Sequence, residues 1–244
     1  KNYFKLNEDI YVNDFTIEIK FLLSPINVIN KIKDSFKKNH ISIDKILCSS
    51  YVKTLLYNKY FEKYDVKVFI DIGFLKTSIL IYFKDRLKFI DYIPIGGENI
   101  TKDISSVLEV DKIRAERIKK KFNQSNATFE SEDNQNNLLI KIVHARVEEI
   151  IDLSFKNYTD IEFLKNKKSI LVFTGEGSKI LSKNSIYLKE QYNYFDEMSF
   201  FEESSEIICD TGLYYMTNKD PYEITLSSKK PKNRGFFEKI FYFF

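Results

Sequence analysis

Apolar residues run almost without interruption through three short segments in the first half of the chain. Segments 66–72, 78–83 and 87–93 are rich in Ile, Val, Phe and Tyr and are separated by short polar turns, which predicts three strands. Strands joined in succession by tight turns form an antiparallel meander. A later apolar segment, 169–174 (SILVFT), predicts a further buried strand.

Helical spacing of apolar residues dominates the chain after the meander. The helices predicted from it cover 100–108, 111–122, 138–158 and 206–216, and another helix begins at Lys179. The segment 123–137 is rich in Asn, Ser, Glu and Asp, so it predicts a loop or a frayed hairpin.

The chain before residue 66 predicts a small α/β unit. Its predicted elements are a strand over 14–23, a helix over 26–38 that begins after Pro25, a strand over 41–47 and a helix over 51–61. Ser49 and Ser50 are candidate N-caps of the last helix.

Composition narrows the class of protein. Hydrophobic residues make up 43% and charged residues 30% of the 244 residues, which is typical of a globular protein. The net charge of +3 gives no case for a nucleic-acid partner. Cys48 and Cys209 lie far apart, and His40 and His144 are the two histidines, so neither a disulfide scaffold nor a histidine-rich metal site is indicated. Because the first residue is Lys1, we expect a piece of a longer protein.

Glycine is scarce, with seven in the whole chain, against a usual share of about 7%. Most of these glycines follow apolar segments, and a chain that avoids glycine elsewhere is expected to keep it where no other residue fits. The glycines in question are Gly73, Gly96, Gly97, Gly175 and Gly177.

The first glycine turn can hold a phosphate. Asp71 ends a buried strand and is followed by a turn that contains Gly73 and by Thr77. Amides in such a turn can donate to phosphate oxygens, and the aspartate can bind Mg²⁺ through water. The alternative is an ordinary hairpin.

Two further groups of residues are compatible with the same ligand. Gly175, Gly177 and Ser178 lie between a strand and a helix, where a ligand can approach the backbone and the helix N-terminus closely. Glu116 and Lys119 are three residues apart and share a helix face, which suits a ribose hydroxyl and a purine edge. The alternatives are a tight turn and a solvated surface ion pair.

Four strings occur in a fixed order, and their order is more informative than any one of them. They are DIGFLKTS at 71–78, YIPIGGENITKDIS at 92–105, AERIK at 115–119 and TGEGS at 174–178. This series resembles the second half of the actin-like ATPases, and most closely the FtsA family of bacterial cell-division proteins. That family has D-I-G-G-G-T-T-D, V-I-P-I-G-G-x-x-I-T-x-D-I-A, A-E-x-I-K and T-G-G-G/A. Arg146 and Glu149 partly match its I-x-P-R-x-x-E string, with Ala145 in place of the proline.

The resemblance implies an α/β chain with the second half of the actin-like (ribonuclease H-like) fold, preceded by an inserted small α/β subdomain. The boundaries it implies are 1–48 for the rest of a 1C-like subdomain, 49–65 for a connecting helix, 66–103 and 169–217 for the 2A core, 104–168 for a 2B-like helical insertion, and 218–244 for a linker and membrane-targeting helix. It also implies ATP with Mg²⁺, the latter held by Asp71 through water. The nucleotide-binding residues it implies are Asp71, Gly73, Thr77, Gly96, Gly97, Glu116, Lys119, Gly175, Gly177 and Ser178.

The C-terminal residues predict a membrane-binding segment. Basic residues precede a short run of large apolar ones, a composition that suits an amphipathic helix on an anionic bilayer, where each basic residue adds about 1 kcal/mol. The residues concerned are Lys230, Lys232, Arg234, Phe236, Phe237, Ile240, Phe241 and Phe244. The alternative is a terminal helix packed in the core.

The departures from the family pattern bear on nucleotide binding. Phe74 and Leu75 replace two motif glycines, and Ser78 replaces the second motif aspartate, so the turn that would cradle phosphate is crowded. Lys76 adds a charge that can contact phosphate instead. Nothing in the sequence supplies the family's first phosphate loop. We therefore expect this chain alone to bind ATP weakly or not at all and to be at most a weak ATPase, without a catalytic residue of its own.

The function implied is that of an actin-like adaptor that tethers FtsZ filaments to the cytoplasmic face of the bacterial inner membrane at the division site and helps to assemble the septal ring. The partners implied are the FtsZ C-terminal peptide, other copies of the protein in a filament, and membrane lipid, with no nucleic acid. The alternative is another actin-fold ATPase, such as a chaperone, a sugar kinase or a pilus-assembly homologue.

Overall fold

The computed structural model describes residues 21–124, 134–156, 167–181 and 192–217. The chain divides into two compact units, one ending at Cys48 and the other beginning at Ser49. The predicted membrane-binding residues, from Lys230 to Phe244, lie outside the described residues.

The described part of the first unit contains one helix, α1 (Ile26–Lys37), which begins directly after Pro25 as predicted. The strand predicted over 41–47 is wrong, because these residues have no strand conformation. An apolar alternation becomes a strand only where a neighbouring strand accepts its backbone hydrogen bonds, and the described part of this unit offers none. Of the strand predicted over 14–23, only residues 21–23 are described, and they are not in a strand.

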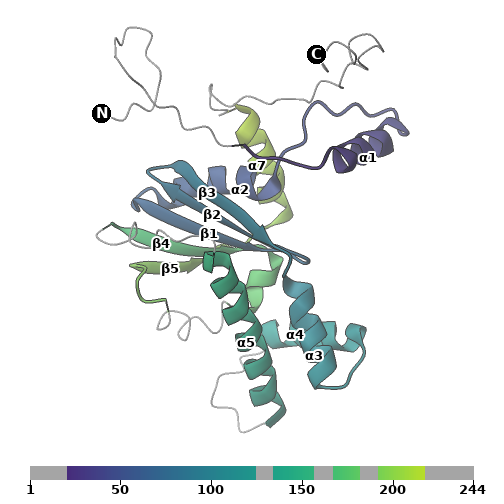
Figure 1. Ribbon diagram of the computed structural model, residues 1–244, viewed down its shortest axis with the longest axis vertical. Helices are drawn as coiled ribbons and strands as arrows, with labels where there is room; N and C mark the ends of the chain where they lie inside the picture. The colour runs from purple at the N-terminus through teal and green to yellow at the C-terminus, as the bar shows by residue number, and fades with distance from the viewer. Residues whose placement is uncertain (1–20, 125–133, 157–166, 182–191, 218–244) are drawn as a thin grey trace, which may run out of the picture. The chain divides into compact units, whose positions relative to one another are not determined.

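The second unit is built on a five-stranded sheet in the order β3-β2-β1-β4-β5 (Figure 1). Its strands are β1 (Val66–Ile72), β2 (Thr77–Phe83), β3 (Arg86–Ile93), β4 (Ser169–Thr174) and β5 (Glu197–Phe200). β1, β2 and β3 form the predicted antiparallel meander, whereas β4 runs parallel to β1 and β5 runs parallel to β4. The four strands predicted for this unit are confirmed, and β5 was not predicted.

Helices cover both faces of this sheet (Figure 1). They are α2 (Ser49–Tyr57), the 3₁₀ turn η1 (Asn58–Phe61), α3 (Gly97–Val107), α4 (Lys112–Gln124), α5 (Asn134–Lys156), the 3₁₀ turn η3 (Glu176–Ile180) and α7 (Ser205–Thr217). The helices predicted over 100–108, 111–122 and 206–216 are confirmed, as is the described part of the helix predicted over 138–158. The helix predicted over 51–61 is an α-helix to Tyr57 and then the 3₁₀ turn η1, and the ends of the loop predicted over 123–137 are helical. The helix predicted to begin at Lys179 is not confirmed, because the described residues there form a 3₁₀ turn that begins at Glu176 and ends at Ile180. No helix among the described residues is both long and apolar enough to cross a bilayer.

Strand periodicity divides the buried residues into two layers. In β1, Val66, Val68, Ile70 and Ile72 pack with residues of α3 and α5, whereas Phe69 packs with Tyr57 of α2 on the other face. Since side chains alternate between the faces of a strand, Asp71 at the end of β1 lies on the same face as Phe69, toward α2. This alternation decides which helix can reach the aspartate.

Candidate functional site

The residues predicted to bind nucleotide gather where β1 and β4 end. Asp71 is paired across the ladders with Ser78 of β2 and with Thr174 of β4. In open α/β sheets, ligands bind beyond the carboxyl ends of the parallel strands, where the loops that follow them meet. The glycine turns after β1 and β4 both lie at this edge.

The turn after β1 packs against the start of α3. The Gly97 amide donates to the Gly73 carbonyl at 2.9 Å, and the Glu98 amide donates to the Phe74 carbonyl at 2.8 Å. A Cβ atom on Gly96 would lie 2.6 Å from the Gly73 carbonyl oxygen and 2.8 Å from the Lys76 amide nitrogen. Gly96 is thus required because one backbone segment lies directly on another.

The turn after β4 packs equally closely against the end of β1. Gly175 has a φ of +85°, and a Cβ there would lie 2.5 Å from the Ile72 carbonyl oxygen and from Asp71 Oδ1. A Cβ on Gly177 would lie 2.6 Å from Ile72 Cγ2. Gly97 is close to both turns, since its Cβ would lie 3.7 Å from Gly177 Cα. The expectation that the scarce glycines mark close approaches is supported, and the atoms approached are those of the protein itself.

Glu116 and Lys119 of α4 reach the same edge. Lys119 Nζ donates to the Gly97 carbonyl at 3.0 Å and to Thr101 Oγ1 at 2.7 Å, and it lies 2.7 Å from Glu116 Oε2. Thr101 Oγ1 donates to the same Glu116 oxygen at 2.6 Å. Partial burial would raise the pKa of Glu116, but the hydrogen bonds from Lys119 and Thr101 outweigh it and lower that pKa. The pair is therefore part of the packing between α3 and α4 rather than a freely solvated ion pair.

Two residues predicted to bind nucleotide have hydroxyl groups that donate to nearby backbone carbonyls. Thr77 Oγ1 donates to the Ile95 carbonyl at 2.8 Å, and Ser178 Oγ donates to the Gly175 carbonyl at 2.8 Å. Arg146, from the partly matched family string, makes a two-pronged contact with Asp103 at 2.6 and 2.8 Å and so ties α5 to α3.

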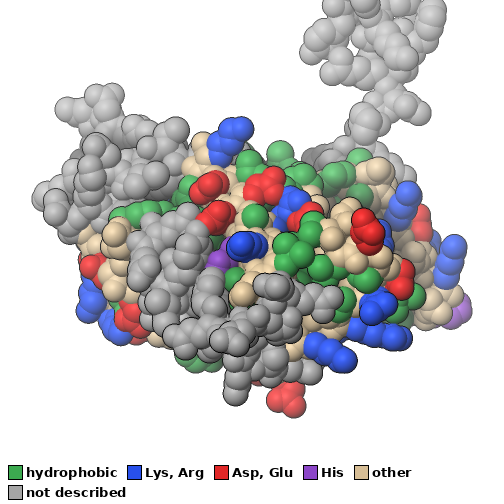
Figure 2. All heavy atoms as spheres, turned by 90° about the horizontal axis from the view of Figure 1, so that it is seen from below, with side chains coloured by type: hydrophobic (Ala, Val, Ile, Leu, Met, Phe, Trp, Pro, Cys, Tyr) green, Lys and Arg blue, Asp and Glu red, His purple; other side chains and the backbone are tan. Residues whose placement is uncertain are grey.

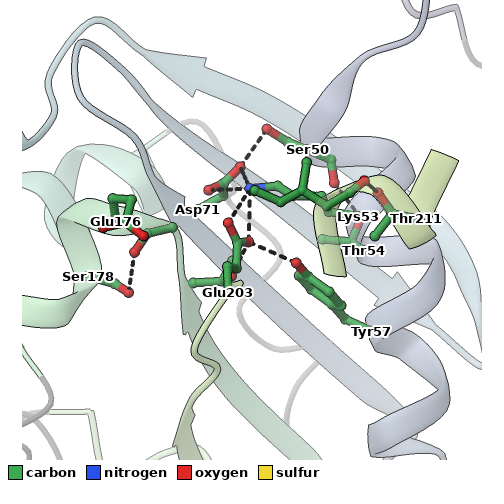
Figure 3. A network of polar contacts seen from close by, with 12 residues as sticks. Ser50, Lys53, Thr54, Tyr57, Asp71, Glu176, Ser178, Glu203 and Thr211 are labelled. Atoms are coloured by element: carbon green, nitrogen blue, oxygen red, sulfur yellow. Dashed lines mark hydrogen bonds and ion pairs between the residues drawn. The ribbon is translucent and has the colours of Figure 1, made fainter. Parts of the chain in front are cut away.

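Asp71 is at the centre of a buried polar network that sequence analysis missed (Figure 3). Lys53 Nζ donates to Asp71 Oδ1 at 3.0 Å, and Ser50 Oγ donates to Asp71 Oδ2 at 2.7 Å. Lys53 also contacts Glu203, whose other donors are the hydroxyls of Tyr57 and Thr174. Ser50 was predicted as a helix cap. It lies within α2 instead, since the helix begins one residue earlier, and its hydroxyl contacts Asp71 and Ser78 rather than a backbone amide of the helix.

The spacing on α2 contains a sign of this network. Ser50, Lys53, Thr54 and Tyr57 follow the i, i+3, i+4, i+7 pattern of a single helix face, and all four are buried. A polar stripe on a helix that must cover a sheet indicates buried polar partners. Nothing in the polar segment around Glu203 indicates that it is one of them.

The electrostatics of the network follow from burial and charge. Burial alone would lower the pKa of Lys53, but the carboxylates of Asp71 and Glu203 outweigh it, and the pKa is raised. Burial and the Glu203 carboxylate both raise the pKa of the Tyr57 hydroxyl. Near neutral pH the network therefore contains an ammonium ion and a neutral phenol.

The arrangement fits Mg²⁺ poorly. Mg²⁺ needs carboxylate oxygens that water or metal can reach, whereas both Asp71 oxygens accept hydrogen bonds from protein donors. In the turn after β1, the amide of Gly73 donates to the Lys76 carbonyl at 2.9 Å, and the amides of Gly97 and Glu98 are also used internally. These amides are not directed at a phosphate.

The sheet order and its two helical layers define the class of protein. Similar solved structures include MreB5 of Spiroplasma citri bound to AMPPNP, with a TM-score of 0.59 and 14% identity over 78% of this chain and 65% of that one. Another is the PilM-PilN type IV pilus biogenesis complex, with a TM-score of 0.54 and 12% identity over 77% of this chain and 54% of that one. The chain has an actin-like ATPase fold, as the sequence motifs implied.

The family follows from sequence. The family described as cell division protein FtsA matches residues 68–193, and the chain belongs to this family. A relative, cell division protein FtsA of Bacillus subtilis strain 168, is 37% identical over 99 residues. That match covers 34% of this chain and 22% of the Bacillus protein, so the chain corresponds to a minor part of that relative's length.

Proposed function

We propose that this protein acts as an FtsA-type adaptor, which tethers FtsZ filaments to the cytoplasmic face of the bacterial inner membrane and helps to assemble the septal ring. The observation that carries the proposal is a groove beside α4, inside the segment that matches the family. Apolar side chains, among them Ile113 and Ile118, line it together with the basic side chains of Arg114, Arg117 and Lys121.

The chemistry of this groove suits an extended acidic peptide with apolar side chains. Ile113 is 69% exposed, so it offers apolar surface that a partner can cover. Three basic side chains line the same groove against one acidic side chain, Asp111, so the groove carries a net positive charge that attracts carboxylates. Figure 2 shows hydrophobic and charged side chains intermixed on the described part of the face seen from below. We assign the FtsZ C-terminal peptide to this groove, within the 2B-like insertion at 104–168.

The test is a titration of a fluorescent FtsZ C-terminal peptide with the full chain. Arg117→Glu reverses a charge in the groove, and Lys120→Glu makes the same charge change on α4 at a residue that does not line it. We expect Arg117→Glu to weaken binding about tenfold and Lys120→Glu to leave it nearly unchanged. No binding by the wild-type chain, or equal loss in both variants, would overturn the assignment.

Membrane tethering is proposed from the C-terminal basic and aromatic residues, which lie outside the described residues. Co-sedimentation with anionic liposomes should recover the full chain and lose a version that ends at Lys230. Equal recovery of both would remove the adaptor proposal.

The proposed nucleotide is ATP, and the fold shared with MreB5 bound to AMPPNP supports it. The amides of Gly73, Gly97 and Glu98, which donate to carbonyl oxygens of the protein, support our expectation that the chain alone binds ATP weakly or not at all. Calorimetric titration with ATP tests this, and micromolar affinity would contradict it. Self-association into a filament belongs to the same proposal and is tested by sedimentation of the full-length protein.

A further inference from the structure

Two carboxylates from distant parts of the chain share one buried ammonium group (Figure 3). Lys53 Nζ lies 3.0 Å from Asp71 Oδ2 and 2.9 Å from Glu203 Oε1. The side chains of Lys53, Asp71 and Glu203 are 9%, 9% and 5% exposed. A single ionic group thus joins α2, the end of β1 and the segment before α7.

Both carboxylates also accept hydrogen bonds from hydroxyl groups. Ser50 donates to Asp71 Oδ2, while Tyr57 and Thr174 donate to Glu203 Oε1 at 2.9 and 2.5 Å. Lys53 Nζ also lies 3.0 Å from Asp71 Oδ1 and 3.1 Å from Glu203 Oε2, so it contacts all four carboxylate oxygens. Gly175 encloses Asp71 further, because its backbone passes so close that a Cβ would lie 2.5 Å from Oδ1.

This geometry is that of a cation site whose cation belongs to the protein. Two buried carboxylates without a counter-ion would repel each other and would take up a proton or a cation. Divalent cations prefer carboxylate and hydroxyl oxygens, which are the groups that converge here. The Lys53 ammonium lies between the two carboxylates and neutralises one of their two charges.

We propose that Lys53 is the resident cation of the Asp71–Glu203 pair and excludes divalent metal ions from it. The carboxylates at the end of β1 therefore need no Mg²⁺ as counter-ion. The family resemblance gives Asp71 a water-mediated Mg²⁺, and the structure disagrees with that role. The proposal does not rest on FtsZ or membrane binding, so the two can fail separately.

The experiment measures Mn²⁺ binding to the full chain by electron paramagnetic resonance and melting temperature in EDTA and in excess Mn²⁺. The variants are wild type, Lys53→Met, and Lys63→Met as a control that removes an exposed lysine paired with Glu197. We expect wild type and Lys63→Met to bind no Mn²⁺ specifically and to melt alike in both conditions. Lys53→Met should bind one Mn²⁺ at least about tenfold more tightly than the nonspecific Mn²⁺ binding of the wild type, and it should melt higher with Mn²⁺ than in EDTA.

Two results would overturn the proposal. One is a Mn²⁺ site in the wild-type chain that Asp71→Asn abolishes. The other is Lys53→Met without any gain in Mn²⁺ affinity or in melting temperature. If Lys53→Met is unfolded in EDTA, the proposal requires Mn²⁺ to restore cooperative melting, and failure to do so counts against it. The double variant Lys53→Met/Glu203→Gln should lose the Mn²⁺ response, because one carboxylate of the pair is gone.

Discussion

Replacing Gly96 by Ala tests whether the scarce glycines are required by contact between backbone segments. The added Cβ would lie 2.6 Å from the Gly73 carbonyl oxygen, 2.7 Å from the Phe74 carbonyl oxygen and 2.8 Å from the Lys76 amide nitrogen. These are backbone atoms, so no flexible side chain can move aside. The turn after β1 must separate from the start of α3.

The magnitude follows from the contacts that would be lost. Separation breaks the hydrogen bonds from Gly97 to Gly73 and from Glu98 to Phe74. Each contributes about 1 kcal/mol net, and groups left without a partner cost more, so we expect a loss of about 2–4 kcal/mol. With a urea dependence of about 2 kcal/mol per molar, the middle of the usual range, the midpoint of unfolding should fall by about 1–2 M.

The assay is urea unfolding of the full chain, followed by far-UV circular dichroism. Gly212→Ala is the matched control, because it lies inside α7 and the added Cβ would have no atom within 4 Å other than those of its chain neighbours and of the helix's own backbone. A helical Gly→Ala change with free space is expected to stabilise by up to about 1 kcal/mol. If Gly96→Ala unfolds at the same urea concentration as wild type, or if Gly212→Ala is as damaging, the reasoning from close approach is refuted.

Three further predictions follow from the core and from the ion pairs. Folding lowers the pKa of Glu116 below its ordinary value of 4.5, so the stability that Glu116 contributes is present above that pH and is lost as the pH falls through the folded pKa. The melting temperature of the wild type should therefore fall more on acidification than that of Glu116→Gln, and parallel profiles of melting temperature against pH would contradict this. Phe173→Ala empties a fully buried position in β4 and should cost about 3–5 kcal/mol in chemical unfolding, whereas a cost below 1 kcal/mol would show that the site collapses. Arg146→Lys removes the two-pronged contact with Asp103 and should lower stability by about 1 kcal/mol, and a melting temperature equal to that of wild type would show that the contact between α3 and α5 does not need it.

The elements that sequence analysis predicted correctly are those whose pattern is local. β1 and β4 are largely apolar and buried along their whole length because both faces of a central strand are covered, and each ends at a glycine turn. The meander followed from three such segments with short turns. The motif order led to the actin-like fold and to the FtsA family, which the comparisons show.

The elements that sequence analysis predicted wrongly or missed depend on a partner elsewhere in the chain. The segment 41–47 has a strand-like alternation but no strand to pair with among the described residues. β5 has the short, partly polar sequence EMSF and becomes a strand because it pairs in parallel with β4. Strand formation at such positions is decided by the neighbour, not by intrinsic preference.

The candidate site shows the same division. The sequence alone placed Asp71 at the end of a buried strand, and it placed the glycines where the backbone needs space. Only the tertiary structure decided that Lys53 and Glu203, 150 residues apart, meet at that aspartate. The strand order and the alternation of β1 direct Asp71 toward α2, and the parallel pairing of β5 brings Glu203 to the same edge. The sequence determines which side chains carry a charge. Which group becomes the counter-ion depends on the packing of segments that are distant in the sequence, and no local pattern reveals that packing.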